Sequence, residues 1–431
     1  MNILGGFISI TGITFLVFVG FIIVLLGFLL GRIRIKGVGL ETAGVFIVSL
    51  LFGVLFNTEA GQTVTQTVAG DNFEISMDAL KIIETAGLVF FVGAVGLIAG
   101  PNFFNNFKKN FKYYIVIGII IIVAGALATV LCFFIGRGAE SSDQEFAAIL
   151  TGIMSGSLTS TPAFSSAKAT AAAVAAGAGS VLSPADAEAL VSVGYGIAYI
   201  FGVVGVVLFV QLIPKITKAN MDEERSKINV VDTGVRSKVK KRFEVEPEGL
   251  FSFAFVLAAG ILIGAIRIPL TGAGFSGACF SLTSTGGVLL AGLLAGHAGH
   301  IGPFSLNLSQ RTLKTFREMG LVMFLIGAGV AGGMKFIQYF KWVYFLYGVI
   351  ITLVPLFIGF LFTKYVLKLS LLNNLGAITG GMTSTPALGA LISTAGTDDV
   401  ASSYAATYPI ALISVVLSSQ FMILILSGMR Y

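Results

Sequence analysis

The stretch Gly156-Ser157-Leu158-Thr159-Ser160-Thr161-Pro162-Ala163 decides the fold, because its core recurs as Gly380-Gly381-Met382-Thr383-Ser384-Thr385-Pro386-Ala387. Both copies of Thr-Ser-Thr-Pro lie inside long apolar runs that are rich in Gly and Ala. A hydroxyl-rich element that breaks a helix is tolerated at membrane depth only where it faces protein or a cavity. One copy in each half of the chain therefore predicts a binding site built between two repeats.

The composition is that of an integral membrane protein. Of 431 residues, 56% are hydrophobic and 11% are charged, whereas soluble domains carry about 25% charged residues. Nearly uncharged apolar runs long enough to cross a hydrocarbon core of about 30 Å recur at Phe7–Leu30, Val38–Phe56, Tyr114–Ile135, Leu190–Ile213, Val343–Thr363 and Ala401–Leu426. Alternating ten-residue patterns are absent, so we expect an all-α polytopic membrane protein.

Positive charges in short loops orient the helices. Arg32, Arg34 and Lys36 follow the first apolar run, which predicts that the N-terminus is outside. The longest polar stretch, Pro214–Gly249, carries nine Lys and Arg residues and is expected to be a cytoplasmic linker. Both assignments hold only if the first motif segment, about Phe146–Leu182, enters the membrane and returns as a re-entrant hairpin. A broken helix that spans the membrane is the alternative.

Several short matches suggest that the two halves are repeats. The Ile-Arg-Ile of residues 33–35 recurs at 266–268, Gly-Leu-Val at 87–89 recurs at 320–322, and Tyr-x-x-x-Tyr at 195–199 recurs at 404–408. An odd number of crossings in the first half makes the repeats inverted. We expect about five spanning helices plus one motif segment in each repeat, with residues 1–213 as the first repeat, 214–249 as the linker and 250–431 as the second repeat.

Each motif is expected to start a helix inside the membrane. A Thr followed by Pro has the chemistry of a helix N-cap and of the first helical position. The free N–H groups and the positive dipole end of such a helix suit carboxylates and other small anions. The motif hydroxyls add donors, or oxygen ligands for sodium near Thr159 and Thr383. The alternative is a simple kink in a buried helix, which the duplication disfavours.

Other residues are expected to lie beside the motifs. Glycines permit close approach, and the paired tyrosines would line the site or anchor the protein at the membrane interface. Lys168 would face a carboxylate substrate or snorkel to the interface, whereas Glu84 is expected at a helix start in a structural role. The candidate substrate-binding residues are Gly156, Thr159, Ser160, Thr161, Pro162, Lys168, Tyr195, Tyr199, Gly380, Gly381, Thr383, Ser384, Thr385, Pro386, Tyr404 and Tyr408. Catalytic residues are not expected, because no nucleophile–base or metal set appears at membrane depth.

Several motifs follow one another along the chain: Gly-x-x-Thr-Ser-Thr-Pro-Ala in both halves, Gly-His-Ile-Gly-Pro at 299–303 ahead of Arg-Glu-Met-Gly-Leu at 317–321, and Tyr-x-x-x-Tyr-Pro at 404–409. In these motifs the chain resembles, over nearly its whole length, the aspartate:alanine exchanger family of bacterial transporters. Members of the family often carry large soluble domains between the halves, where this chain has only the linker. His300 replaces the Arg usual before Ile-Gly-Pro, and Ile200 stands where the first repeat often has Pro.

The resemblance implies a secondary carrier in the bacterial inner membrane. We expect exchange of small carboxylates, such as aspartate-type amino acids or dicarboxylates, by alternating access in which one unit rocks or slides. A sodium-coupled carboxylate symporter and an anion channel are the alternatives. The expected partners are a small anionic substrate, the lipid bilayer and a second copy in a homodimer, with no nucleic acid. No cofactor is expected apart from a coupling ion, sodium or a proton.

Overall fold

The structure is a computed structural model that describes residues 2–3, 8–9, 12–35, 38–39, 42–58, 73–105, 112–177, 180, 182–228, 245–269, 279–306 and 308–428. Its helices are α1 (Gly12–Gly31), α2 (Ala43–Phe56), α4 (Phe73–Asn105), α5 (Lys112–Gly136), α6 (Asp143–Ser157), α7 (Thr161–Ala175), α8 (Pro184–Ile216), α9 (Met221–Ser226), α10 (Leu250–Gly264), α11 (Thr283–Ala298), α12 (Gln310–Tyr339), α13 (Trp342–Leu361), α14 (Leu371–Gly381), α15 (Thr385–Ala395) and α16 (Ala401–Ser427).

The strands form short antiparallel pairs at the ends of helices. They pair β1 (Asn2–Ile3) with β2 (Ile8–Ser9), β3 (Arg34–Ile35) with β4 (Val38–Gly39), β5 (Arg267–Pro269) with β6 (Cys279–Ser281), and β7 (His300–Ile301) with β8 (Phe304–Ser305).

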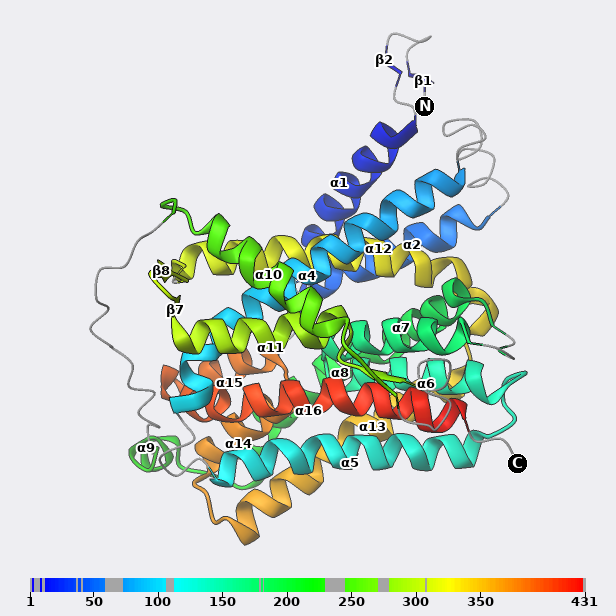
Figure 1. Ribbon diagram of the computed structural model, residues 1–431. Coiled ribbons are helices and arrows are strands. Elements are labelled where there is room, and N and C mark those ends of the chain that lie inside the picture. The colour runs from blue at the N-terminus through cyan, green and yellow to red at the C-terminus, as the bar shows by residue number, and fades with distance from the viewer. Residues whose placement is uncertain are drawn as a thin grey trace.

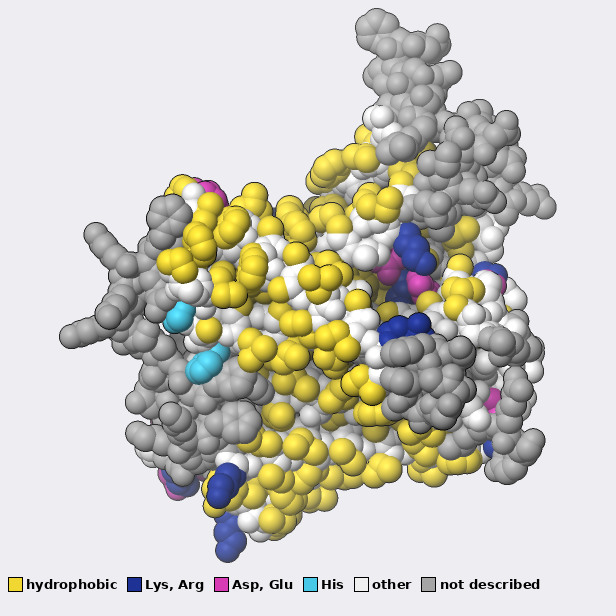
Figure 2. All heavy atoms as spheres, in the orientation of Figure 1, with side chains coloured by type: hydrophobic (Ala, Val, Ile, Leu, Met, Phe, Trp, Pro, Cys, Tyr) yellow, Lys and Arg dark blue, Asp and Glu magenta, His cyan; other side chains and the backbone are white. Residues whose placement is uncertain are grey.

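The predicted all-α polytopic class is confirmed. Within the described residues, seven helices are long and apolar enough to span a membrane, namely α1, α4, α5, α8, α12, α13 with its π-helical extension to Val366, and α16. Hydrophobic side chains cover much of the visible surface of these helices (Figure 2), as lipid contact requires. Two helices begin earlier than the apolar pattern suggests: α4 starts at Phe73 and α12 at Gln310, because polar turns extend both beyond their apolar windows.

The helices form two packed layers (Figure 1). One, here called the α4 layer, contains α1, α2, α4, α10, α11 and α12, in which α4 packs on α11 and α12, and α12 on α2. The other, the hairpin layer, contains α5–α8 and α13–α16, in which α6 packs on α8 and α14 on α16. The layers meet mainly where α8 lies against α12. Each half of the chain thus contributes to both layers.

The first motif lies at the tip of a hairpin made by α6 and α7, the first hairpin. Ser142 caps α6 by accepting a hydrogen bond from the Glu145 N–H, and the Glu145 side chain accepts one from the N–H of Ser141, the residue before the cap. At the far end of the hairpin, the Ser180 hydroxyl donates to Gln144 Oε1 at 3.1 Å. The chain therefore returns to the side from which it entered, as a re-entrant segment does.

The second motif lies at the tip of a shorter hairpin, made by α14 and α15, the second hairpin. Figure 1 shows it in the left half of the molecule, whereas the first hairpin lies in the right half and α5 and α16 cross the full width. Opposite entry of the two hairpins is the arrangement that inverted repeats produce.

Close helix contacts follow the same pattern in both halves. A Cβ on Gly44 would overlap the Gly27 carbonyl between α1 and α2, and a Cβ on Gly287 would overlap the Gly260 carbonyl between α10 and α11. Small residues let membrane helices approach closely, so these glycines fix the two crossings. The duplication itself, and the domain boundaries drawn from it, stay predictions.

Candidate functional site

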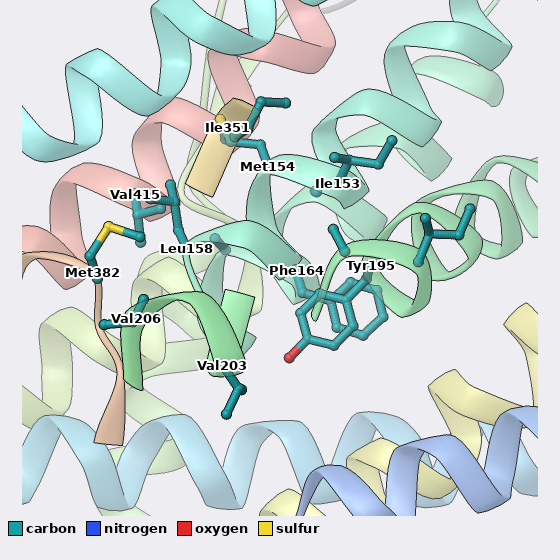
Figure 3. Packing of buried hydrophobic residues seen from close by; sticks show 14 of the residues in the cluster. Ile153, Met154, Leu158, Phe164, Tyr195, Val203, Val206, Ile351, Met382 and Val415 are labelled. Carbon is teal, nitrogen blue, oxygen red and sulfur yellow. The ribbon is translucent and has the colours of Figure 1, made fainter. Parts of the chain in front are cut away.

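The tips of the two hairpins meet and hold each other through crossed hydrogen bonds. The Thr159 hydroxyl donates to the Met382 carbonyl at 3.1 Å, and the Thr383 hydroxyl donates to the Leu158 carbonyl at 2.9 Å. Each motif therefore donates a hydrogen bond to the backbone carbonyl of the residue that directly precedes the other motif. Leu158 and Met382 are themselves fully buried, beside Val415 of α16 (Figure 3). The tips form one structural unit, although 220 or more residues separate the paired positions.

The same two threonines adopt the left-handed backbone region. Thr159 has φ of 52° and Thr383 has φ of 53°. A positive φ is a genuine outlier for a β-branched residue; it costs about 1–3 kcal/mol and persists only where the surroundings enforce it. Here the crossed hydrogen bonds and the turn after α6 and α14 enforce it. Strain of this kind gathers at ligand sites and switch regions.

Beyond each strained threonine a helix begins. The N-caps are Ser160 for α7 and Ser384 for α15, with Pro at the start of each helix. Thr161 and Thr385, which the sequence predicted as the caps, are instead the first helical residues, so each cap lies one position earlier than predicted. The Ser160 hydroxyl accepts from the Ala163 N–H at 3.3 Å. The Ser384 hydroxyl is buried and has no hydrogen-bond partner among the described residues.

A cavity of about 360 Å³ opens beside the tips, at the junction of the two layers. The hairpin layer contributes both motifs, whereas α4 contributes an apolar wall. The lining residues from these parts include Thr159, Ser160, Thr161, Pro162, Thr383, Thr385, Pro386, Phe91, Val95, Ile98 and Ala99. An apolar wall facing a few converging polar groups is the usual makeup of a small-molecule site.

Tyrosines from both halves of the chain complete the lining. Tyr199, Tyr404 and Tyr408 all line the cavity, and Tyr404 lies with its hydroxyl 3.4 Å from the Thr385 hydroxyl. The rings of Tyr404 and Tyr408 stack with centroids 5.2 Å apart. These three tyrosines contact the cavity rather than a membrane interface.

Tyr195 has a different place. Its ring is buried between those of Phe164, at 4.0 Å, and Tyr199, at 4.8 Å, and it does not line the cavity. Figure 3 shows the Phe164 and Tyr195 rings face to face. The stack therefore links the cavity-lining Tyr199 to the body of the first hairpin.

The cavity also holds a charged pair that the sequence reasoning missed. Arg317 and Glu318, both on α12, line the cavity, and Arg317 Nη2 lies 2.6 Å from Glu318 Oε1. Arg317 is the one cationic side chain among the described lining residues. The hydropathy pattern places Arg317 in a loop, because α12 begins before the apolar window from which the helix was predicted. Its position inside the Arg-Glu-Met-Gly-Leu match is the signal that could have found it.

The predicted glycines act on packing near the tips. A Cβ on Gly156 would come within 2.7 Å of the Tyr195 carbonyl, and one on Gly380 within 2.5 Å of the Tyr404 carbonyl. A Cβ on Gly381 would overlap the Ile121 side chain. None of the three lines the cavity, and neither does Ser384. Gly156 and Gly380 let each hairpin pack closely against the helix that follows it, α8 and α16, whereas Gly381 lets the second hairpin pack against α5.

Lys168 lies outside the cavity lining and forms an ion pair with Glu84 of α4. Its side chain is 5% exposed, so it does not snorkel to the interface. Glu84 lies well inside α4, not at its start, because the helix begins at Phe73. The expectation that Glu84 lies at a helix start is therefore wrong.

The comparison with known families decides the assignment. The profile described as a predicted permease membrane region of the aspartate–alanine exchanger type matches residues 19–215 and 252–424. The chain belongs to the aspartate:alanine exchanger family. The unmatched residues between the two segments, 216–251, cover most of the linker and include α9.

Curated relatives of the family are named as transporters. Uncharacterized transporters of Bacteroides fragilis and Bacteroides thetaiotaomicron are each 26% identical, covering 93% of this chain and 96% of their own length. One of Desulfotalea psychrophila is 25% identical, covering 95% of this chain and 97% of its own length. The Bacteroides fragilis alignment runs over 562 positions, more than the 431 residues here, so that relative carries residues without a counterpart in this chain. The protein is thus a multi-pass membrane transporter.

Proposed function

We propose that this transporter is a secondary active carrier that exchanges small carboxylates, such as aspartate-type amino acids or dicarboxylates. The observation that carries the proposal is the cavity in which two helix N-termini and Arg317 converge. Each helix N-terminus presents about half a positive charge and free N–H groups. The negative charge of Glu318 offsets part of this positive potential. Arg317 would then bind one substrate carboxylate, and Glu318 would bind an ammonium group on the substrate.

The cavity size fits such a substrate. Its volume of about 360 Å³ lies at the small end of the range of roughly 300–1,000 Å³ for ligand pockets. Three tyrosines and the α4 wall would enclose the hydrocarbon part of the acid. The crossed hydrogen bonds hold the motif hydroxyls and the helix starts in fixed positions, which limits the entropy lost on binding.

Alternating access follows from the position of the cavity between the layers. Movement of the hairpin layer against the α4 layer, by rocking or sliding, would expose the tips first to one side and then to the other. We place the carrier in the bacterial inner membrane with the N-terminus outside and the linker, residues 214–249, in the cytoplasm. We also propose that the protein forms a homodimer. The mass of the detergent-solubilised particle tests this proposal separately.

Counterflow in proteoliposomes tests the proposal. Vesicles are loaded with unlabelled L-aspartate, L-alanine or succinate and then receive the labelled acid outside. An exchanger accumulates label only in vesicles loaded with a substrate. A requirement for a sodium gradient would instead favour the symporter, which would use the motif hydroxyls as sodium ligands, and a continuous conductance would favour a channel. No counterflow with any small carboxylate would sink the exchanger proposal.

A matched pair of variants tests the role of Arg317. Arg317→Gln removes the cation from the cavity, whereas Arg311→Gln removes an exposed cation from the same helix. Loss of a charge-assisted contact to a carboxylate is worth about 1.5–3 kcal/mol, so KM should rise roughly 10- to 100-fold for Arg317→Gln. The Arg311→Gln control should keep the original KM. Equal KM values for the two variants would remove Arg317 from the site.

A further inference from the structure

The contact between Glu84 and Lys168 joins the two layers of the molecule. Glu84 belongs to α4, and Lys168 belongs to α7, the return arm of the first hairpin. Both side chains are largely buried, at 12% and 5% exposed. A buried ionisable pair at membrane depth is costly to keep and is a candidate functional site by default. The substrate cavity does not use this pair.

Charges around the pair come from three helices. Lys81 lies one turn before Glu84 on α4, and Glu188 of α8 faces both, with Lys81 Nζ 3.2 Å from Glu188 Oε1. On the α12 side, Gly327 packs against the Glu84 side chain and brings no charge. Two acidic and two basic side chains therefore give the cluster a net charge of zero.

The cluster has a route to water. Lys81 is 56% exposed, whereas Lys168 behind it is 5% exposed. Figure 2 shows Lys, Arg, Asp and Glu side chains gathered in a hollow between α4 and α7. A proton can therefore reach Glu84 from the solvent through the outer pair of the cluster.

The pair is also connected to the substrate site. Lys168 lies seven residues beyond Thr161 on α7, which places it about 10 Å along the helix from the motif. Its Nζ lies 5.9 Å from the centre of the Phe164 ring, and Phe164 stacks on Tyr195, which stacks on the cavity-lining Tyr199. A movement of the first hairpin that opens the cavity must also move Lys168 relative to Glu84.

We propose that Glu84, paired with Lys168, is a proton-binding site that couples proton movement to transport; this rests on the proposed carrier function. In the paired state the Glu84 carboxylate and the Lys168 ammonium neutralise each other. When α7 moves away from α4, Glu84 loses its cation in a buried position, and an uncompensated buried charge is strongly destabilising. The carboxylate then takes up one proton from water and becomes neutral. When the pair forms again, that proton leaves to water.

The test measures proton and substrate movement in the same vesicles. Proteoliposomes loaded with a pH-sensitive dye and with L-alanine receive L-aspartate outside, or another pair of different acids that gives counterflow. Wild-type protein should change the lumenal pH in step with uptake, and a proton ionophore should abolish the change. Substrate movement without a pH change overturns the coupling and leaves the carrier proposal intact. Absence of any counterflow sinks the carrier proposal instead.

A double variant that removes both charges tests whether this pair is the proton-binding site. Glu84→Gln with Lys168→Met removes both charges together, a replacement that is often neutral for stability. This variant should keep a counterflow rate within about threefold of wild type, but its change in lumenal pH should be smaller by about tenfold or more. The control, Asp186→Asn with Lys335→Met, removes a more exposed pair between α8 and α12 and should keep both signals. Proton movement that survives in the Glu84 variant overturns the assignment.

A conservative change covers the case in which the neutral variant does not fold. Glu84→Asp keeps the charge but shortens the side chain, so the contact with Lys168 weakens. The pH dependence of counterflow should shift, whereas Asp186→Glu should leave it unchanged. An unaltered pH profile for Glu84→Asp would also overturn the proposal, because a purely structural pair would change expression or melting temperature without moving the profile.

Discussion

The two hairpins carry the same motif but are held in different ways. In the first hairpin, α6 and α7 have 15 residues each, and 23 of these 30 residues are buried. In the second, α14 and α15 have 11 residues each, and α15 buries only Ala387, Leu391 and Ala395 fully. The same motif therefore precedes a return arm that is mostly buried in the first hairpin, α7, and one that is largely not buried in the second, α15.

The bases of the hairpins differ as well. The first hairpin closes on itself through Ser180 and Gln144. The second is held by the linker helix α9: Glu224 accepts from the Leu371 N–H at 2.9 Å, and Arg225 Nε donates to the Ala395 carbonyl at 2.5 Å. Since local opening is easiest where few apolar contacts must break, the comparison indicates that the second hairpin opens at a lower free energy than the first.

Small changes of volume should show the largest difference between the hairpins. Gly152 of α6 lies against α8 so closely that a Cβ would overlap the Val191 carbonyl, whereas a Cβ on Gly389 of α15 would meet nothing within 4 Å. Gly152→Ala should destabilise the protein by about 1–3 kcal/mol. Gly389→Ala should be neutral or stabilise by up to about 1 kcal/mol, because Ala favours helices. Thermal unfolding in detergent measures both, and equal shifts would contradict the difference in packing.

The tips should respond alike, because their hydrogen bonds are reciprocal. Thr159→Val and Thr383→Val each remove one crossed bond at nearly constant volume, at a cost of about 1 kcal/mol in stability. Both should also impair counterflow to a similar extent. Because the tips act as one unit, the double variant should lose less than the sum of the single losses. Strictly additive losses, or a loss from only one threonine, would mean that the tips act separately.

The linker helix should affect only the second hairpin. Arg225→Ala removes the contact with Ala395, whereas Lys227→Ala removes pairs made only within α9. Hydrogen exchange over residues 385–395 should become a few-fold faster for Arg225→Ala, which corresponds to about 1 kcal/mol. Exchange over residues 161–175 should stay the same in both variants. Faster exchange in the first hairpin would show that α9 stabilises the whole layer.

The two N-cap serines should give the smallest effects and still differ. Ser160→Ala removes an observed cap bond and should cost about 0.5–1 kcal/mol. Ser384 makes no such bond, so Ser384→Ala should leave the melting temperature almost unchanged. A larger loss for Ser384→Ala in the absence of substrate would contradict the capping difference. A loss of substrate affinity alone would instead assign the free Ser384 hydroxyl to binding.

Features that depend on neighbouring residues could be predicted from the sequence. The motif, its Pro and its Gly-rich surroundings define a helix break and a new N-terminus locally, and charge counts in short loops indicated a re-entrant first segment. The tyrosine pairs were predicted because a spacing of four residues places them on one helix face. Three of those four residues line the cavity.

Features that depend on packing between distant segments could not be predicted. Lys168 and Glu84 lie 84 residues apart, and their pairing arises only because α7 packs beside α4. Arg317 reaches the cavity because α12 extends three turns before its apolar window. Hydropathy marks the part of a helix in lipid, not its full length, so polar ends that line a site escape it.

The most direct test of the central claim is a cryo-electron microscopy map with and without the acid that gives counterflow. The proposal that both tips hold one anion predicts added density between residues 159–162 and 383–386, with one carboxylate beside Arg317. Acid-dependent density elsewhere, with this space unchanged, would contradict it.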